Sequence, residues 1–183
     1  MTRVLLCDDH EVFADALAMA LTAHGKDVVA VTRTVAQALV HVEGTRPDVV
    51  VMDLHFGDGP DGLAAIRALR ERSPEIHLLL LSGAVDGRVL GEAVKAGADG
   101  VISKTKPLED LLRALERVAS GEFYADATLL RDSLRPAPDT DEVQLSAQFL
   151  TPREREVLSR CAPAVARAHG AAGARTARGR SPG

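Results

Sequence analysis

The stretch VVVMDLHFGDGPDG, residues 49–62, joins four apolar residues directly to the carboxylate of Asp53 and then to a turn rich in Gly and Asp. A short apolar run bounded by turn residues is typical of a strand that is buried on both faces. A carboxylate at the edge of such a core costs several kcal/mol unless another group compensates its charge. We therefore expect the compensating group to come from elsewhere in the chain.

The same unit, an apolar run followed by helical periodicity, recurs five times within residues 1–121. Strands are expected at 3–7, 27–31, 48–53, 76–82 and 100–103. Helices are expected at 11–24, 34–43, 62–72, 86–96 and from Pro107 to Gly121, with glycines as stops. Apolar strands that alternate with helices indicate an α/β fold with a five-stranded parallel sheet, doubly wound by helices on both faces.

Polar side chains stand where these strands end. Asp8 and Asp9 follow the first strand, Asp53 ends the third, Ser82 ends the fourth and Lys104 follows the fifth. Ligands of such sheets bind beyond the carboxyl ends of the strands, so these five residues should converge on one site. Three carboxylates and one ammonium carry a formal charge of −2, which a single Mg²⁺ would neutralise, and carboxylate oxygens suit that ion.

A divalent cation, a lysine, a hydroxyl and an exposed carboxylate suit phosphoryl transfer, which depends on positioning and charge neutralisation. Asp53 would be the nucleophile and would form an aspartyl phosphate. Lys104 and Mg²⁺ would neutralise the phosphoryl oxygens, and the Ser82 hydroxyl would donate a hydrogen bond to the new group. Each residue alone also fits a plainer role, since paired acids often cap helices and a lone lysine is usually solvated.

Taken in order, these residues closely resemble the receiver domain of bacterial two-component response regulators over residues 3–120. KAGADGVISK, residues 95–104, resembles the fifth-strand signature of that family, and LTPREREVL, residues 150–158, resembles the opening of the helix-turn-helix output domain of its NarL/LuxR-type members. The resemblance implies a flavodoxin-like receiver and a transcription regulator that is phosphorylated on Asp53 by a sensor histidine kinase. It also implies a signalling protein rather than an enzyme, and dimerisation on phosphorylation.

The resemblance further implies a ligand set for Mg²⁺, made of Asp8, Asp9, Asp53 and the backbone carbonyl of His55. The six histidines are scattered, and no histidine side chain is expected to bind a metal. A hydrolase of the aspartyl-phosphate type would use similar carboxylates. It would need a second Asp two residues after the nucleophile, where this chain has His55, which argues against that function.

Three features depart from the family pattern. The loop after Asp53 lacks the usual proline and is one residue longer before Gly62, and Ser82 replaces the commoner threonine. The switch-aromatic position, three residues before Lys104, is occupied by Val101, so any switch is expected to run through Ser82 and the helix at 86–96.

The chain changes character after residue 121. Residues 122–148 are predicted to be a linker, residues 149–161 the remnant of the first helix of a LuxR-type helix-turn-helix, and residues 162–183 a disordered Ala/Gly/Arg-rich tail. This break indicates a truncation or a shifted reading frame in the output domain. The alternative function is a stand-alone receiver that acts as a protein-binding switch or a phosphate sink.

Charge follows the same division. Residues 1–120 hold 13 Lys and Arg against 18 Asp and Glu, a net charge of −5, whereas the chain from Val157 onward holds five arginines and no acids. We therefore expect DNA to be bound weakly or not at all, without sequence preference. The longest apolar runs are far too short to span a membrane, and the acidic N-terminus does not resemble a signal peptide, so a cytoplasmic protein is expected.

Overall fold

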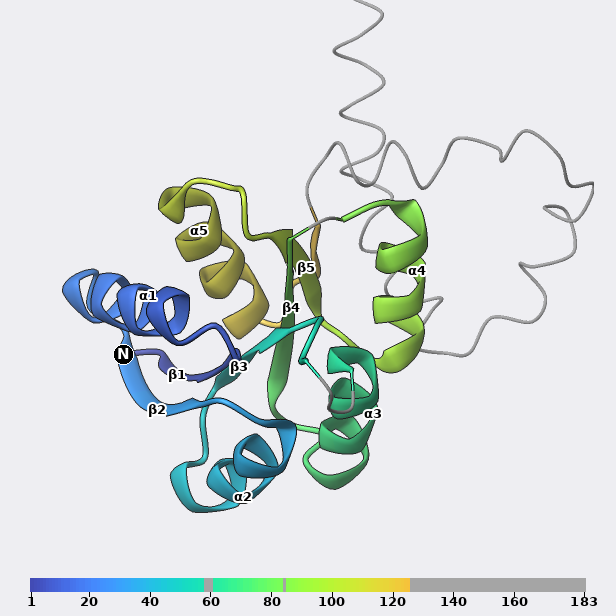
Figure 1. Ribbon diagram of the computed structural model, residues 1–183, viewed down its shortest axis with the longest axis horizontal. Helices are drawn as coiled ribbons and strands as arrows, with labels where there is room; N and C mark the ends of the chain where they lie inside the picture. The colour runs from blue at the N-terminus through green and yellow to red at the C-terminus, as the bar shows by residue number, and fades with distance from the viewer. Residues whose placement is uncertain (58–60, 84, 126–183) are drawn as a thin grey trace, which may run out of the picture.

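The strands form one parallel sheet in the order β2-β1-β3-β4-β5-β6 (Figure 1). The computed structural model describes residues 1–57, 61–83 and 85–125. The strands are β1 (Arg3–Cys7), β2 (Asp27–Thr32), β3 (Val49–Asp53), β4 (His77–Ser82), β5 (Gly100–Ser103) and β6 (Tyr124–Ala125). The predicted α/β class and the first five strands are confirmed, and their carboxyl ends meet at one edge.

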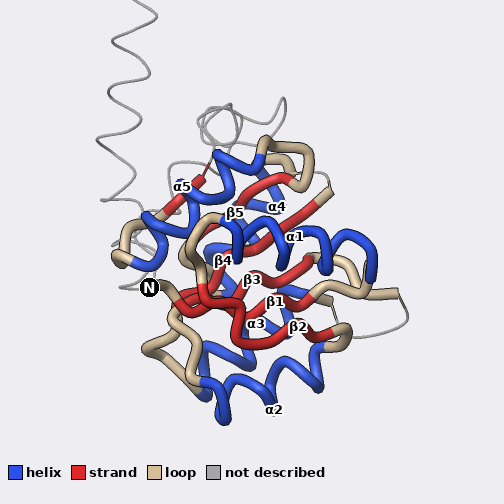
Figure 2. The backbone as a smooth tube through the Cα atoms, turned by 90° about the vertical axis from the view of Figure 1, so that its left-hand side faces the viewer, coloured by secondary structure: helices blue, strands red, loops and turns tan. Residues whose placement is uncertain are grey.

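In the part of the chain that the structure describes, five helices cover both faces of this sheet, as the alternation of elements predicts. They are α1 (Glu11–Ala23), α2 (Val35–Thr45), α3 (Gly62–Arg72), α4 (Gly87–Ala96) and α5 (Leu108–Ala119). Buried residues of α1 and α5 pack together on one face, and those of α2, α3 and α4 pack on the other. Figure 2 shows the strands running between α1 on one side and α2 on the other.

Alternation along each strand divides its side chains between the two layers. In β1, Val4 and Leu6 join the cluster under α1 and α5, whereas Leu5 and Cys7 join the cluster under α2, α3 and α4. Every residue of β3 is buried, including the carboxylate at its end. A strand buried on both faces has no room for polar side chains before its last position, which explains the uninterrupted apolar run.

Among the described residues, the sheet has six strands rather than the five predicted. β6 extends the sheet beyond β5, with Tyr124 opposite Gly100 and Ala125 opposite Val101, and it lies in the segment that the sequence assigns to a linker. Two residues are too few to show a strand periodicity. Their conformation depends on hydrogen bonding to β5, which is distant in sequence, so local pattern does not reveal it.

The first residue of α3 lies directly against the end of β3. The main-chain nitrogen of Gly62 donates a hydrogen bond of 2.8 Å to the carbonyl of Leu54. A Cβ atom at Gly62 would lie 1.9 Å from the carbonyl oxygen of Asp53, so only a residue without a side chain fits there. This contact fixes the strand end that carries Asp53 to the helix that follows it.

Most of the predicted C-terminal organisation lies outside the described residues. This holds for the linker from residue 126 onward, the helix-turn-helix remnant at 149–161 and the tail at 162–183. Within the described ranges, no helix is both long and apolar enough to cross a membrane.

Candidate functional site

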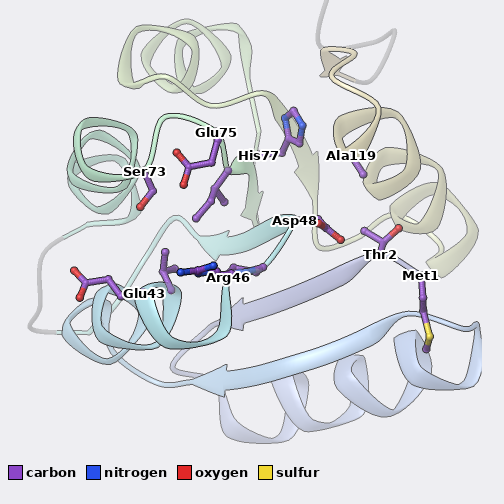
Figure 3. A pocket seen from close by; sticks show the side chains of 12 residues that line it. Met1, Thr2, Glu43, Arg46, Asp48, Ser73, Glu75, His77 and Ala119 are labelled. Carbon is purple, nitrogen blue, oxygen red and sulfur yellow. The ribbon is translucent and has the colours of Figure 1, made fainter.

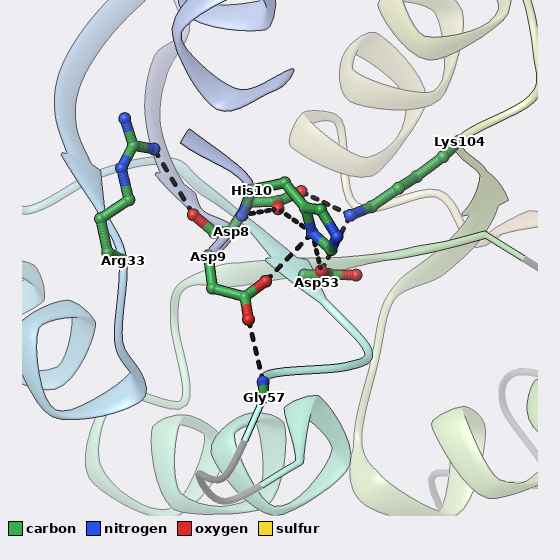
Figure 4. A network of polar contacts seen from close by, with 7 residues as sticks. All are labelled: Asp8, Asp9, His10, Arg33, Asp53, Gly57 and Lys104. Atoms are coloured by element: carbon green, nitrogen blue, oxygen red, sulfur yellow. Dashed lines mark hydrogen bonds and ion pairs between the residues drawn. The ribbon is translucent and has the colours of Figure 1, made fainter. Parts of the chain in front are cut away.

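Lys104 is the group that compensates the charge of Asp53. Its Nζ atom lies 2.8 Å from Asp53 Oδ2 and 2.7 Å from Asp8 Oδ2, so it bridges the ends of β1 and β3 (Figure 4). Both carboxylates are buried, with Asp53 only 2% exposed. An ammonium bound to two buried carboxylates replaces much of the solvation that they lose on folding.

Asp9 is positioned from the opposite side of the site. The main-chain N–H of Gly57, in the loop between β3 and α3, donates a hydrogen bond of 2.9 Å to Asp9 Oδ2. This bond lowers the pKa of Asp9 from its usual value and keeps the carboxylate ionised. This hydrogen bond connects the loop between β3 and α3 to the residues that follow β1.

The environment shifts the pKa values of Asp53 and Lys104 upward. Burial raises the pKa of Asp53, and the hydrogen bond from Lys104 only partly opposes this effect. Burial alone would lower the pKa of Lys104, but its bonds to Asp53 and Asp8 outweigh burial, so its pKa is raised and it stays charged. The site therefore holds a permanent cation beside a carboxylate that is costly to ionise.

This raised pKa predicts a pH dependence of stability when divalent cations are removed by a chelator. Because the pKa of Asp53 is higher in the folded than in the unfolded state, its contribution to the free energy of unfolding is fully present below the unfolded-state pKa. This contribution is lost as the pH rises through the folded-state pKa. Asp53→Asn cannot ionise, so at neutral pH it should be more stable than the wild type, and the two should converge in acid. Urea unfolding of both proteins over the pH range in which carboxyl groups titrate measures this difference. A difference in stability that does not change with pH would contradict the prediction.

Ser82 and Val101 occupy the positions that the sequence predicts. Ser82 ends β4 and is fully buried, and its main-chain carbonyl accepts a hydrogen bond of 2.7 Å from the nitrogen of Lys104. Val101 is fully buried in β5, between Leu80 of β4 and Ala125 of β6. A buried valine has no aromatic ring to move between solvent and core, and a switch that runs through Ser82 and α4 remains a prediction.

His55 contributes to the site through its backbone rather than its ring. Burial raises the pKa of the Asp53 carboxyl, and the main-chain amide of His55 acts in the opposite direction. The side chain is exposed and lines a cavity of about 390 Å³ together with Asp61, Val85, Arg88 and Glu92, between the β3–α3 loop and α4. The metal-binding role of its carbonyl remains a prediction.

Two residues at the site were missed by the sequence analysis. The His10 Nδ1 atom lies 3.1 Å from Asp9 Oδ1 and 3.3 Å from Asp8 Oδ1, and Figure 4 shows the ring directed into the acidic cluster. On α1, the ring centroid of Phe13 lies 4.9 Å from the Nζ atom of Lys104, within the range of a cation–π contact. Adjacency to Asp8 and Asp9 was the only available signal for His10, and nothing local distinguishes Phe13 from a core residue.

The donor atoms fit a hard divalent cation. Asp8, Asp9, His10 and Asp53 each offer a ligand atom, and these atoms lie within 4.8 Å of one another. The buried Asp8 Oδ2 and Asp9 Oδ1 atoms have no hydrogen-bond partner among the described residues, although Asp8 Oδ2 forms its ion pair with Lys104. Carboxylate oxygens in excess over the one nearby ammonium are what Mg²⁺ requires.

A second cavity, of about 700 Å³, lies at the amino ends of the strands, opposite the acidic cluster (Figure 3). Its lining includes Thr2 before β1, Asp48 before β3 and His77 at the start of β4, and none of the predicted site residues contributes to it. The carboxyl edge of the sheet therefore remains the functional candidate.

Comparison with known sequences gives a single family over most of the described chain. The family profile of the response regulator receiver domain matches residues 4–116. The oxygen regulatory protein NreC of Staphylococcus epidermidis (strain ATCC 12228 / FDA PCI 1200) is 33% identical over 175 residues, which cover 92% of this chain and 78% of that protein. An alignment of this length extends past the receiver and into the C-terminal part of the chain.

A further relative and two solved structures are also response regulators or transcription regulators similar to this chain. The DNA-binding transcriptional activator DevR/DosR of Mycobacterium tuberculosis is 35% identical over 86% of this chain and 73% of that protein. A LuxR-family two-component response regulator from Aurantimonas sp. SI85-9A1 superposes with a TM-score of 0.69 at 26% identity, covering 73% of this chain and 95% of that chain. A response regulator from Burkholderia pseudomallei gives 0.59 at 32% identity, covering 66% and 70%.

Proposed function

Since this chain belongs to the response regulators of two-component systems, through its receiver domain, we propose that Asp53 is the residue that accepts the phosphoryl group. The observation that carries this proposal is the contact of Lys104 with the buried carboxylates of Asp53 and Asp8 at the ends of β3 and β1. The chain acts as a signalling switch whose covalent change is made on its own side chain, rather than as an enzyme that turns over a separate substrate.

The donor of the phosphoryl group is a phosphohistidine of a sensor histidine kinase. A carboxylate oxygen of Asp53 attacks phosphorus, and the bond between phosphorus and the histidine nitrogen breaks. The leaving imidazole keeps the electron pair of that bond and takes a proton from solvent. Lys104 is already positioned to neutralise the phosphoryl oxygens, and Ser82 at the end of β4 donates a hydrogen bond to the product.

Asp8, Asp9, Asp53 and the backbone carbonyl of His55 would hold Mg²⁺. When bound, this ion supplies charge neutralisation for the phosphoryl oxygens, which three carboxylates would otherwise repel. The similar Burkholderia pseudomallei response regulator has a phosphorylated aspartic acid and a calcium ion, which supports both the acceptor and a divalent cation beside it.

The chain is proposed to be of transcription-regulator lineage, because DevR/DosR is a DNA-binding transcriptional activator and the similarity to NreC extends past the receiver. Its own binding to DNA is proposed to be weak or absent and without sequence preference. The acidic receiver, with a net charge of −5 over residues 1–120, would itself be repelled by DNA. Dimerisation on phosphorylation and the cytoplasmic location expected from the sequence belong to the same proposal. Footprinting on DNA distinguishes regulation of transcription from the alternative of a stand-alone receiver.

The test of the proposed site is the substitution Asp9→Ala. Removal of one carboxylate ligand should weaken Mg²⁺ binding at least about tenfold, or 1.4 kcal/mol, and should slow labelling of Asp53 in parallel. Calorimetric titration with Mg²⁺ measures the first effect, and incubation with a small acyl phosphate or phosphoramidate measures the second.

The matched control is Asp27→Ala, which removes an exposed carboxylate at the amino end of β2 that pairs, among the described residues, with Arg3 at 3.6 Å. This variant should bind Mg²⁺ and become labelled as the wild type does. Unchanged Mg²⁺ affinity in Asp9→Ala would remove Asp9 from the ligand set.

A further inference from the structure

We propose that Phe13, in the first turn of α1, positions Lys104 for phosphoryl transfer by presenting the face of its ring to the lysine ammonium. The inference rests on the proposed acceptor role of Asp53 and deepens it, because it gives a role to a residue outside the polar set that the sequence predicts. A phenyl ring offers no nucleophile, no acid and no ligand for a hard cation. Phe13 is therefore a positioning residue, which acts through Lys104.

Lys104 reaches the site over a long distance. It follows β5, whereas its carboxylate partners Asp53 and Asp8 stand at the ends of β3 and β1, and β4 lies between β5 and β3. Figure 4 shows its extended stem directed toward both carboxylates. A four-carbon stem has many rotamers, and fixing one of them costs conformational entropy. The contacts of the ammonium therefore decide how much of the time it stands where the phosphoryl oxygens arrive.

The ring of Phe13 supplies a third contact to this ammonium, in addition to the two carboxylates. The Nζ atom of Lys104 lies over the ring, 4.9 Å from its centroid, and cation–π attraction extends to about 6 Å. The lysine side chain is only 16% exposed, so its ammonium is largely shielded from water. Desolvation strengthens the attraction between a cation and the negative face of a ring, so this contact helps to fix the position of the ammonium.

Phe13 is held in place by the apolar core and by the start of α1. The ring is half-buried and packs against the cluster of buried residues under α1 and α5. The main-chain N–H of Ala14 donates a hydrogen bond of 3.0 Å to the carbonyl of His10, which fixes the first helical turn close to the end of β1. The ring therefore keeps its place when the charges of the site change.

The contact matters most while Asp53 reacts. Before the reaction, Lys104 is paired with both Asp53 and Asp8. Formation of the aspartyl phosphate replaces the charge of the Asp53 carboxylate with that of the phosphoryl oxygens, so the ammonium has to exchange one partner for another. The contacts with Asp8 and with the ring persist through this exchange. Because the ring then provides one of two remaining contacts rather than one of three, its loss should lower the rate of phosphoryl transfer.

The experiment measures the rate at which the full chain gains phosphate from a small acyl phosphate at saturating Mg²⁺. Phenylalanines with one, two and three ring fluorines are incorporated at position 13. Fluorine draws charge away from the face of the ring but nearly preserves its size and apolar character, so the packing stays and the cation–π contact weakens. The rate constant should fall with each fluorine, to about three- to tenfold below the wild type for the trifluorinated ring. Phe13→Leu, without a ring, should be slowed at least as much.

Two further variants separate the face of the ring from its packing. Phe13→Tyr keeps the ring and should be labelled at close to the wild-type rate. Phe123→Leu removes a half-buried ring that packs in the other layer, with the cluster under α2, α3 and α4, and should not change the rate. Equal rates across the fluorinated series, with Asp53 still labelled, would overturn the inference and leave Phe13 as a packing residue. A wild type that gains no phosphate on Asp53 would overturn the proposed acceptor, and this inference with it.

Discussion

Asp53→Asn is expected to incorporate no phosphate. The amide has nearly the same shape as the carboxylate and keeps an oxygen that can accept the hydrogen bond from Lys104, but it is not a nucleophile. The wild type, incubated with Mg²⁺ and a small phosphoryl donor, should gain one phosphate that is stable in acid and labile to base and hydroxylamine. Mass spectrometry of the intact chain measures this gain directly.

The control for this result is Asp61→Asn. Asp61 caps α3 by accepting a hydrogen bond of 2.7 Å from Ala64, only eight positions along the chain from Asp53. Asparagine caps helices as well as aspartate does, so this variant should fold and label as the wild type does. Labelling of Asp53→Asn to the wild-type level would show that the acceptor is another residue.

Gly62→Ala is expected to cause the largest loss of stability among the substitutions considered. The added Cβ would lie 1.9 Å from the Asp53 carbonyl oxygen and 2.9 Å from Leu54 Cα, and both are backbone atoms that cannot rotate away. Either α3 moves off the end of β3 or the fold is lost. We expect a decrease of at least about 3 kcal/mol in the free energy of unfolding, measured with urea.

Gly91→Ala provides a matched control in α4. A Cβ at Gly91 meets no atom within 4 Å, so alanine should raise stability by about 0.5–1 kcal/mol through its better helix propensity. The two substitutions are chemically identical and both lie in helices, so opposite signs would isolate the contact with Asp53. A Gly62→Ala variant as stable as the wild type would contradict the close approach of α3 to β3.

The sequence was sufficient to predict the order of the first five strands and the helices along the chain, and the convergence of Asp8, Asp53 and Lys104 on one site. Buried parallel strands must be apolar until they end, so the first polar residue after each run marks the carboxyl edge of the sheet. Glycine stops were equally readable, since Gly25, Gly97 and Gly121 all have positive φ.

Features that depend on distant pairing or on side-chain direction were not predictable in this way. β6 exists only through its bonds to β5, and two residues carry no periodicity. The ring of His10 reaches the carboxylates because a main-chain hydrogen bond orients it, and the contact of Phe13 with Lys104 depends on how α1 crosses the sheet. The pattern of residue types along the chain contains no information on how strands pair at a distance or in which direction a side chain points.

The pairing of β6 with β5 also determines where the receiver can be separated from the rest of the chain. A fragment that stops at residue 121, the boundary suggested by the sequence, would expose the main-chain groups of Gly100 and Val101 that β6 covers. Unpaired strand edges recruit strands from other molecules and promote aggregation. We therefore expect the stable receiver unit to extend at least to Ala125. Tyr124 and Ala125 cover the edge of β5 and so prevent it from pairing with strands of other molecules in solution.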